Sequence, residues 1–255
     1  MTKLEEKPII NKEIFNVDVN IFELVQKVYD KNFNREKNKI GCSELPHCAR
    51  KTIISRLFNI PSKTNMKMLH GKIHHSIIQE PKILSNLISS IYQQLAIKKK
   101  EINVITEKHL IYEILPGKFL EGHVDIFTDD FLFEIKTTSV PLEYSKEIVL
   151  FYYVQTNTYL KLVNLTLGFI LCINLRAFQS DMTNLSNIWK KYGYIIPIHF
   201  NQELYNKTIE KAILMFKFID QNEFHITGPE FKWECKNCSK EIKEICLKEQ
   251  KKEFS

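Results

Sequence analysis

GHVDIFTDDFLFEIKT, residues Gly122–Thr137, predicts a β-hairpin with a carboxylate on each strand. One apolar run ends near Asp125, and the next apolar run contains Glu134 and Lys136. Between the two runs lies Thr-Asp-Asp, the turn-forming residues 128–130. Short runs rich in aromatic and branched residues, separated by turn chemistry, are typical of paired strands.

This hairpin has the groups needed to hold a divalent metal ion against a phosphodiester. Alternate side chains of a strand share a face, so Glu134 and Lys136 point the same way and Ile135 points into the opposite layer. Asp125 can lie across from Glu134, and Mg²⁺ would accept both carboxylates and the Ile135 carbonyl as oxygen ligands. The Lys136 ammonium would then orient water and stabilise developing charge. The competing interpretation is an exposed hairpin with ordinary charges.

Composition narrows the class of protein. The chain has 255 residues and 44% hydrophobic residues, enough for one large domain with its own core. We find no run of about 20 apolar residues, and residues 1–7 lack the apolar stretch of a secretory signal. We therefore expect a cytoplasmic chain without a membrane partner. The net charge of +6 permits a nucleic-acid partner, and the absence of GxxxxGK[ST] argues against a P-loop ATPase.

Six cysteines form the second notable pattern, at positions 42, 48, 172, 235, 238 and 246. Cys235 and Cys238 have a metal-binding spacing, and Cys246 follows within reach. A four-ligand site needs one more cysteine from far away, and Cys48 and Cys42 are the candidates. Cys48 would lie at or near a helix start, where a thiolate is favoured. Spacing alone leaves zinc and an iron–sulfur cluster both open, and reduced thiols in a loop are the competing interpretation.

The order of the remaining elements indicates an α/β protein with a mixed sheet. We expect helices over residues 19–31, 43–58, 67–79, 83–97, 145–162 and 202–219. We expect strands over residues 102–114, 118–127, 131–138, 165–175 and 194–200.

Two of these helices carry residues that bear on the hairpin. Gly71 and His75 are four apart and share a face, so His75 can approach a ligand over a residue without a side chain. Imidazole suits Mn²⁺ better than Mg²⁺. Gln155 and Tyr159 are also four apart and could orient a nucleotide or the attacking water. The competing interpretations are a half-buried helix histidine and the edge of an amphipathic helix.

Taken together, these features resemble the CRISPR-associated Cas-four exonucleases, which belong to the RecB-like branch of PD-(D/E)xK nucleases. Each piece is weak by itself, whereas their order and spacing together are specific, and the ending Phe231–Cys238 looks like archaeal members. The residues that carry the likeness are Ser43–Leu45, Cys48–Lys51, Gly71, His75, Gly122–Asp125, Glu134–Lys136, Gln155, Tyr159, Cys235, Cys238 and Cys246.

The resemblance implies a fold and a set of site residues. The fold is α/β: a restriction-endonuclease-like mixed sheet flanked by helices, with a helical region over residues 1–100, a nuclease core over 101–225 and a cysteine module over 226–255. The implied catalytic set is Asp125, Glu134, Lys136, Gln155 and Tyr159. The implied ligands of Mg²⁺ or Mn²⁺ are His75, Asp125, Glu134 and the carbonyl of Ile135. The implied ligands of a [4Fe–4S] cluster are Cys48, Cys235, Cys238 and Cys246.

The resemblance also implies a function. The chain would be a metal-dependent DNA exonuclease, acting 5′→3′ on single-stranded or end-frayed DNA. In CRISPR antiviral defence it would trim DNA ends for the Cas-one/Cas-two integrase during spacer acquisition. Two alternatives stay open: a mobile-element or viral homologue used in DNA recombination, and a non-catalytic iron–sulfur adaptor that binds DNA. The sequence does not specify an oligomeric state.

Overall fold

The computed structural model describes residues 36–60, 71–72, 75–99, 101–138, 146–174, 193–224, 228–229 and 232–253. The helix expected over residues 19–31 lies outside these ranges, as does much of the helix expected over 67–79. None of the described helices combines the length and the apolar character needed to cross a membrane.

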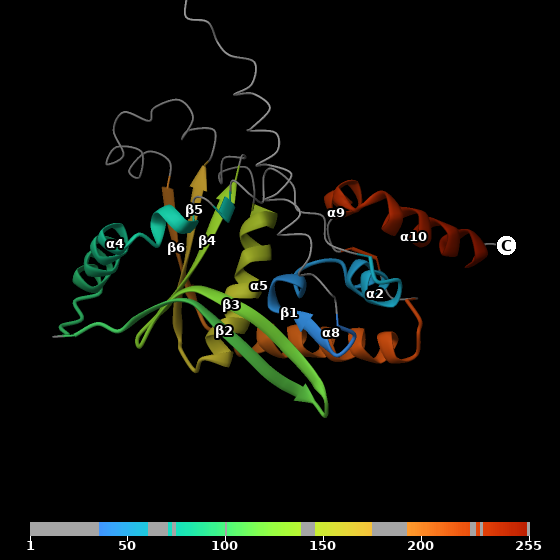
Figure 1. Cartoon of the computed structure of the whole chain (residues 1–255), viewed down its shortest axis with the longest axis horizontal. Helices are drawn as coiled ribbons and strands as arrows, with labels where there is room; N and C mark the ends of the chain where they lie inside the picture. Colours follow the sequence, from blue (N-terminus) through green and yellow to red (C-terminus); the bar gives the residue numbers. More distant parts are fainter. Residues whose placement is uncertain are drawn as a thin grey trace, which may run out of the picture.

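A mixed sheet forms the centre of the molecule (Figure 1). Its strands are β1 (Lys39–Gly41), β2 (Val104–Leu115), β3 (Lys118–Thr128), β4 (Leu132–Thr138), β5 (Leu167–Asn174) and β6 (Gly193–His199). The order is β1-β3-β4-β5-β6, with β2 paired to the other edge of β3. The β1–β3 and β4–β5 pairs are parallel, and the β2–β3, β3–β4 and β5–β6 pairs are antiparallel. The predicted α/β class with a mixed sheet is confirmed.

Strand β3 has two different neighbours along one edge, with a gap between them. Residues 119–121 pair with β1, and residues 126–127 pair with β4. Within the described part of the chain, no strand pairs with residues 122–125 on this edge, although β2 continues along the other edge. The gap contains Asp125, so one of the carboxylates predicted for the site lies where the sheet is open.

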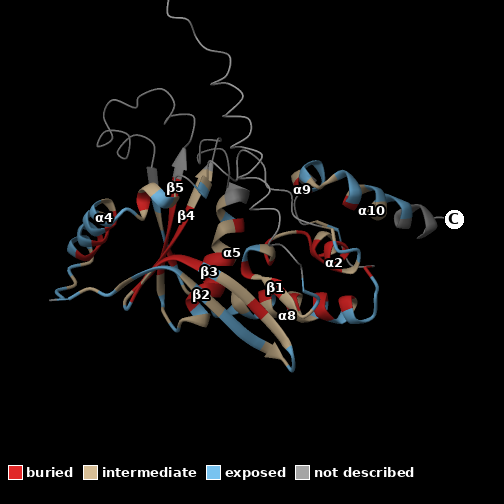
Figure 2. Ribbon diagram, in the orientation of Figure 1, coloured by how far each residue is buried: buried red, intermediate tan, exposed pale blue. Residues whose placement is uncertain are grey.

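Helices cover both faces of the sheet, as the alternation of apolar residues along β4 predicts. On one face, α4 (Pro81–Gln94) packs on Phe133 and Ile135. On the other face, α5 (Lys146–Leu162) and α8 (Gln202–Asp220) share a larger core with Leu132 and Val124. Figure 2 shows the buried residues concentrated along the central strands and the helix faces that touch them. Glu134 therefore projects toward the α5 side, as expected.

The helix expected over residues 43–58 is interrupted in the structure. A 3-10 turn, η1 (Cys42–Glu44), precedes α2 (Ala49–Leu57). Pro46 lacks an amide hydrogen, and Cys48 takes a non-helical backbone with φ −53° and ψ 119°. Cys48 is therefore the N-cap of α2, which agrees with the prediction that it lies at or near a helix start.

Pro81 also differs from expectation, because it begins a helix as well as following one. Residues 75–78 are helical, and α4 starts at Pro81 itself rather than near residue 83. The Glu80 carboxylate accepts the Lys82 and Ile83 N–H groups, both at 3.1 Å. Proline is well suited to the first position of a helix because its missing N–H would be unsatisfied there anyway.

The C-terminal helices lie beside α2, away from the sheet (Figure 1). They are α9 (Lys232–Asn237) and α10 (Lys240–Glu253). The expected division of the chain near residues 100 and 225 stays a prediction. The arrangement nevertheless brings the last described helix against one of the first, which matters for the cysteines below.

Candidate active site

Asp125 is held in place by the backbone of the neighbouring strand. The β3–β4 ladder pairs Ile126 with Phe133 and then stops. Two residues beyond Phe133, the Ile135 N–H donates to Asp125 Oδ2 at 2.6 Å. The side chain thus replaces a backbone acceptor, so the carboxylate is both buried and oriented, with a side-chain exposure of 10%.

Glu134 is the most buried charged group of the predicted set, at 1% exposure. Its Oε2 accepts hydrogen bonds from Lys136 Nζ at 2.8 Å and from Gln155 Nε2 at 3.0 Å. Its Oε1 is buried and accepts no hydrogen bond from the described residues. Because buried oxygens are nearly always satisfied, this open acceptor fits the oxygen donor set that a hard divalent cation requires.

Burial and neighbouring charges control the ionisation of Glu134 and Lys136. Burial raises the pKa of Glu134 to about 8, with the Asp125 carboxylate adding to the rise and the Lys136 ammonium opposing it. Burial acts to lower the pKa of Lys136, but the Glu134 and Asp125 carboxylates raise it by more. Lys136 therefore carries its proton and charge at neutral pH. A cation bound beside Glu134 would lower the pKa of this carboxyl, because positive charge favours its ionised form.

Gln155 and Tyr159 extend this network from helix α5. Gln155 Nε2 lies 3.2 Å from the Tyr159 hydroxyl oxygen, as well as bonding to Glu134. Tyr159 is only 2% exposed, and burial raises its pKa well above the usual value. A Cβ atom at Gly122 would lie 2.5 Å from the Tyr159 hydroxyl. The glycine in the β3 gap therefore makes room for the tyrosine that supports the carboxylate network.

His75 approaches the Asp125 carboxylate. Its Nδ1 lies 3.4 Å from Asp125 Oδ1, the oxygen that is not bonded to Ile135. Gly71, on the preceding turn, is close to β4: a Cβ there would lie 3.2 Å from Thr137 Oγ1. The small residue therefore permits close contact with the strand, which is a more specific role than the helix-face argument predicted.

The sequence did not point to two further residues of the site. Gln79 Nε2 donates to the Asp125 backbone oxygen and to Glu107 Oε1, both at 2.9 Å. Single ligand atoms of His75, Glu107 and Asp125 all lie within 4.8 Å of one another. A lone glutamate in a polar strand gives no sequence signal for such a position, so only the strand register could reveal it.

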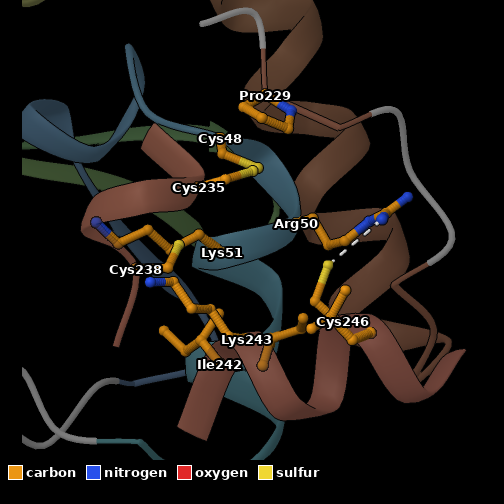
Figure 3. A pocket seen from close by; sticks show the side chains of 11 residues that line it. Cys48, Arg50, Lys51, Pro229, Cys235, Cys238, Ile242, Lys243 and Cys246 are labelled. Carbon is orange, nitrogen blue, oxygen red and sulfur yellow. Dashed lines mark hydrogen bonds between the residues drawn. The ribbon is translucent and has the colours of Figure 1, made fainter. Parts of the chain in front are cut away.

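The cysteine site forms a separate cavity of about 220 Å³ between α2 and the C-terminal helices (Figure 3). Four cysteines line it: Cys48, Cys235, Cys238 and Cys246. Cys42, the other candidate for the fourth position, is fully buried in the core beneath the sheet. Arg50 Nη1 donates to Cys246 Sγ at 3.5 Å, adding a positive group beside the sulfurs. The structure thus brings together the predicted four cysteines from both ends of the described chain.

Glu234 joins the cysteine module to the start of α2. Its Oε1 accepts the Cys48 N–H at 2.9 Å and lies 3.2 Å from His47 Nδ1. Burial acts to raise the pKa of Glu234, but the bonds from His47 and Cys48 lower it overall. This ionised, buried carboxylate fixes Cys48 relative to Cys235, the next residue in α9.

Comparison with known proteins identifies partial similarities. Residues 42–114 match the family model described as DNA replication factor Dna2. None of the curated proteins matches the chain.

Among solved structures, SSO0001 shares 18% identity at a TM-score of 0.51, covering 86% of this chain and 93% of its own. That likeness shows a shared fold.

Two other solved structures are described as exonucleases. The alkaline exonuclease LHK-Exo from Laribacter hongkongensis has a TM-score of 0.46 and 11% identity, covering 72% of this chain and 89% of its own. A phage-related exonuclease from Haemophilus somnus 129PT has a TM-score of 0.39 and 15% identity, covering 76% of this chain and 97% of its own.

Proposed function

We propose that this chain is a metal-dependent deoxyribonuclease that hydrolyses DNA from its ends. The observation that carries the proposal is the buried Glu134 carboxylate, which bonds to Lys136 and Gln155 while its Oε1 stays open beside Asp125. Two carboxylates, a charged lysine and a histidine at one open sheet edge are the groups that phosphodiester hydrolysis requires. The Dna2 match over residues 42–114 supports DNA as the substrate.

Each residue of the site has a distinct part in this proposal. His75, Asp125, Glu134 and the Ile135 carbonyl would hold Mg²⁺ or Mn²⁺. Such a cation, when bound, supplies Lewis-acid charge that activates water and neutralises the phosphate.

The remaining groups of the site orient the two carboxylates and stabilise the charge that develops on the phosphate. The Ile135 N–H keeps the Asp125 carboxylate in one orientation, and Gln155 does the same for Glu134. The Lys136 ammonium lies 2.8 Å from Glu134 and keeps its proton, so it can donate to an anionic phosphate oxygen as charge develops. The Tyr159 hydroxyl supports Gln155 from within the core.

The finer parts of the proposal rest on the resemblance to Cas-four exonucleases. They are a preference for single-stranded or end-frayed DNA, 5′→3′ polarity, and trimming of DNA ends for a Cas-one/Cas-two integrase in CRISPR spacer acquisition. A [4Fe–4S] cluster on Cys48, Cys235, Cys238 and Cys246 belongs to the same proposal. Its support here is that the four thiols line one cavity, with the Arg50 guanidinium beside Cys246.

The decisive experiment is a cleavage assay with end-labelled single-stranded DNA and Mn²⁺. We expect Glu134→Gln and Lys136→Met to lower the rate at least about 100-fold, because each removes a group that acts on the transition state. Labels at the 5′ or 3′ end report the polarity. Glu203→Gln is the matched control, since Glu203 is an exposed glutamate on α8 that forms an ion pair with Lys207.

Thermal unfolding establishes that the variants fold. Equal cleavage by wild type, Glu134→Gln and Lys136→Met would contradict the proposal. Binding of DNA by the wild type without any metal-dependent cleavage would instead favour the adaptor alternative.

A further inference from the structure

Glu107 has an unusual backbone conformation in the middle of β2. Its neighbours pair with β3 in a constant register, Thr106 with Ile126 and Lys108 with Val124, which places Glu107 opposite Asp125. Glu107 itself is not paired, and its φ is +51°, in the left-handed region that a glutamate rarely adopts. A strand that keeps its register but rotates one residue out of the ladder carries a local strain that the surroundings must maintain.

The rotation directs Glu107 into a set of contacts at the candidate metal site. Gln79 Nε2 donates both to Glu107 Oε1 and to the Asp125 backbone oxygen, each at 2.9 Å. The Asp125 carbonyl is therefore bonded to a side-chain amide at the point where the β2 ladder is open. Gln79 thereby fixes the glutamate against the strand that carries Asp125.

Three potential ligand atoms meet at this point. One each from His75, Glu107 and Asp125 lie within 4.8 Å of one another. Asp125 Oδ2 is occupied by the Ile135 N–H, whereas Asp125 Oδ1 is the oxygen 3.4 Å from His75. Imidazole and carboxylate together are a ligand set for Mn²⁺ and related divalent cations.

A second observation at the same site also indicates a cation. Glu134 lies near enough to Asp125 for their charges to interact, and its buried Oε1 accepts no hydrogen bond from the described residues. Asp125 thus lies close to His75 and Glu107 on one side and interacts with the Glu134 carboxylate on the other, so its neighbours offer several oxygen and nitrogen atoms to a cation.

We propose that Glu107 is a further ligand of the divalent cation, binding it together with His75 and Asp125. This inference rests on the proposed function, because it takes the metal site of that function as its starting point. It explains why a strained glutamate occupies this strand position and why an amide holds it there. Mn²⁺ fits this mixture of nitrogen and oxygen ligands. Mg²⁺ would bind mainly through the carboxylate oxygens and less through the His75 imidazole.

Calorimetric titration of the full chain with Mn²⁺ alone, without DNA, tests the inference. Glu107→Gln keeps the side-chain length and an oxygen that can still accept from Gln79, so it removes the charge and little else. We expect it to raise the Kd for Mn²⁺ about tenfold or more, in the range that lost metal-site contacts produce. Glu101→Gln, an exposed glutamate three residues before β2, is the control and should bind as the wild type does.

Asp125→Asn separates failure of the inference from failure of the proposed function. If the wild type binds Mn²⁺, Asp125→Asn does not, and Glu107→Gln binds with unchanged affinity, the inference is wrong while the metal site stands. If the wild type itself binds no Mn²⁺, both are wrong. Thermal unfolding without metal confirms that the Glu107 variant is folded, and the rise in midpoint on adding Mn²⁺ should be smaller for it than for the wild type.

Discussion

At the scale of single residues, Glu134 is the group whose state depends most on what the site contains. It is almost fully buried, with Lys136 and Gln155 bonded to Oε2, whereas Oε1 accepts no hydrogen bond from the residues that the structure describes. Removing a carboxylate from water favours its neutral form, and the adjacent Asp125 charge acts in the same direction. A bound divalent cation would favour the ionised form of Glu134 and so lower its pKa. The stability of the metal-free and of the metal-bound protein should therefore depend differently on pH.

The stability of the metal-free protein should therefore fall as pH rises toward 8. The pKa of Glu134 is raised from 4.5 to about 8 in the folded state. Below 4.5 both the folded and the unfolded chain hold this proton. Between the two values only the folded chain holds it, so its contribution to the free energy of unfolding is lost with increasing pH.

Urea unfolding in the presence of a chelator at pH 6, 7 and 8 measures this dependence. Glu134→Gln cannot release the proton, so its free energy of unfolding should change less across the same range. Glu203→Gln, at an exposed site, should retain the wild-type slope. Parallel curves for wild type and Glu134→Gln would show that the carboxyl does not titrate in this window.

At the scale of elements, the site depends on the gap in β3 between its pairings with β1 and β4. Gly122 and Asp125 both lie in this gap. The Tyr159 ring of α5 occupies the space over Gly122, and the Asp125 carboxylate takes the next N–H of β4. An uninterrupted ladder would have used that N–H for backbone pairing, so the gap is what allows a side chain to enter the sheet.

Gly122→Ala should disturb this element without touching a charged group. The added Cβ would lie 2.5 Å from the Tyr159 hydroxyl and 2.6 Å from its ring, too close for a small adjustment. We expect a loss of about 1–3 kcal/mol in stability, the usual cost of overpacking. Because Tyr159 supports Gln155 and Glu134, cleavage of DNA should also decrease.

Gly228→Ala is the matched control, since none of the described residues comes within 4 Å of a Cβ there. The two variants are compared by thermal unfolding and by the end-labelled DNA assay. Equal melting temperatures for Gly122→Ala and Gly228→Ala would mean that Tyr159 can move aside, and the packing argument would be wrong.

The sequence predicts the strands and helices of this site better than it predicts how the strands pair with one another. Alternation along residues 131–138 correctly separates Glu134 from the buried Phe133 and Ile135, because side-chain direction in a strand follows position alone. The pairing of residues 39–41 with β3 could not be predicted, since three residues give no periodicity. Nor could the left-handed conformation of Glu107, because strand contacts impose it and glutamate does not favour it.

At the scale of the whole molecule, the cysteine cavity joins segments that are almost 190 residues apart. Glu234 bonds to the N–H of Cys48 across 186 positions, and α10 packs against α2. On this side of the molecule, Ile54 of α2 and Ile242 of α10 belong to the apolar core that also contains residues of the sheet. A metal centre shared by Cys48 and the C-terminal cysteines would add its binding free energy to this junction.

The nature of that centre can be decided by anaerobic purification followed by iron, sulfide and zinc analysis. We expect about four iron and four sulfide per chain, as a [4Fe–4S] cluster requires. Cys48→Ala should lose both, since Cys48 lines the cavity. Cys172→Ala should keep both, because Cys172 is 0% exposed and burial raises its pKa to about 11, leaving a neutral thiol in the core. One zinc per chain without sulfide would contradict the assignment.

Loss of the metal centre at the four cysteines should weaken the contact between α2 and the C-terminal helices more than it lowers the rate of DNA cleavage. Limited proteolysis of Cys48→Ala should cut within the C-terminal helices faster than in the wild type, because the metal centre then no longer links α2 to these helices. The sheet that carries Asp125 and Glu134 also packs on α4 through a second apolar cluster, so residual cleavage of DNA should be measurable after the cysteine module loosens. Complete unfolding of Cys48→Ala would instead mean that the two regions are stable only as one unit.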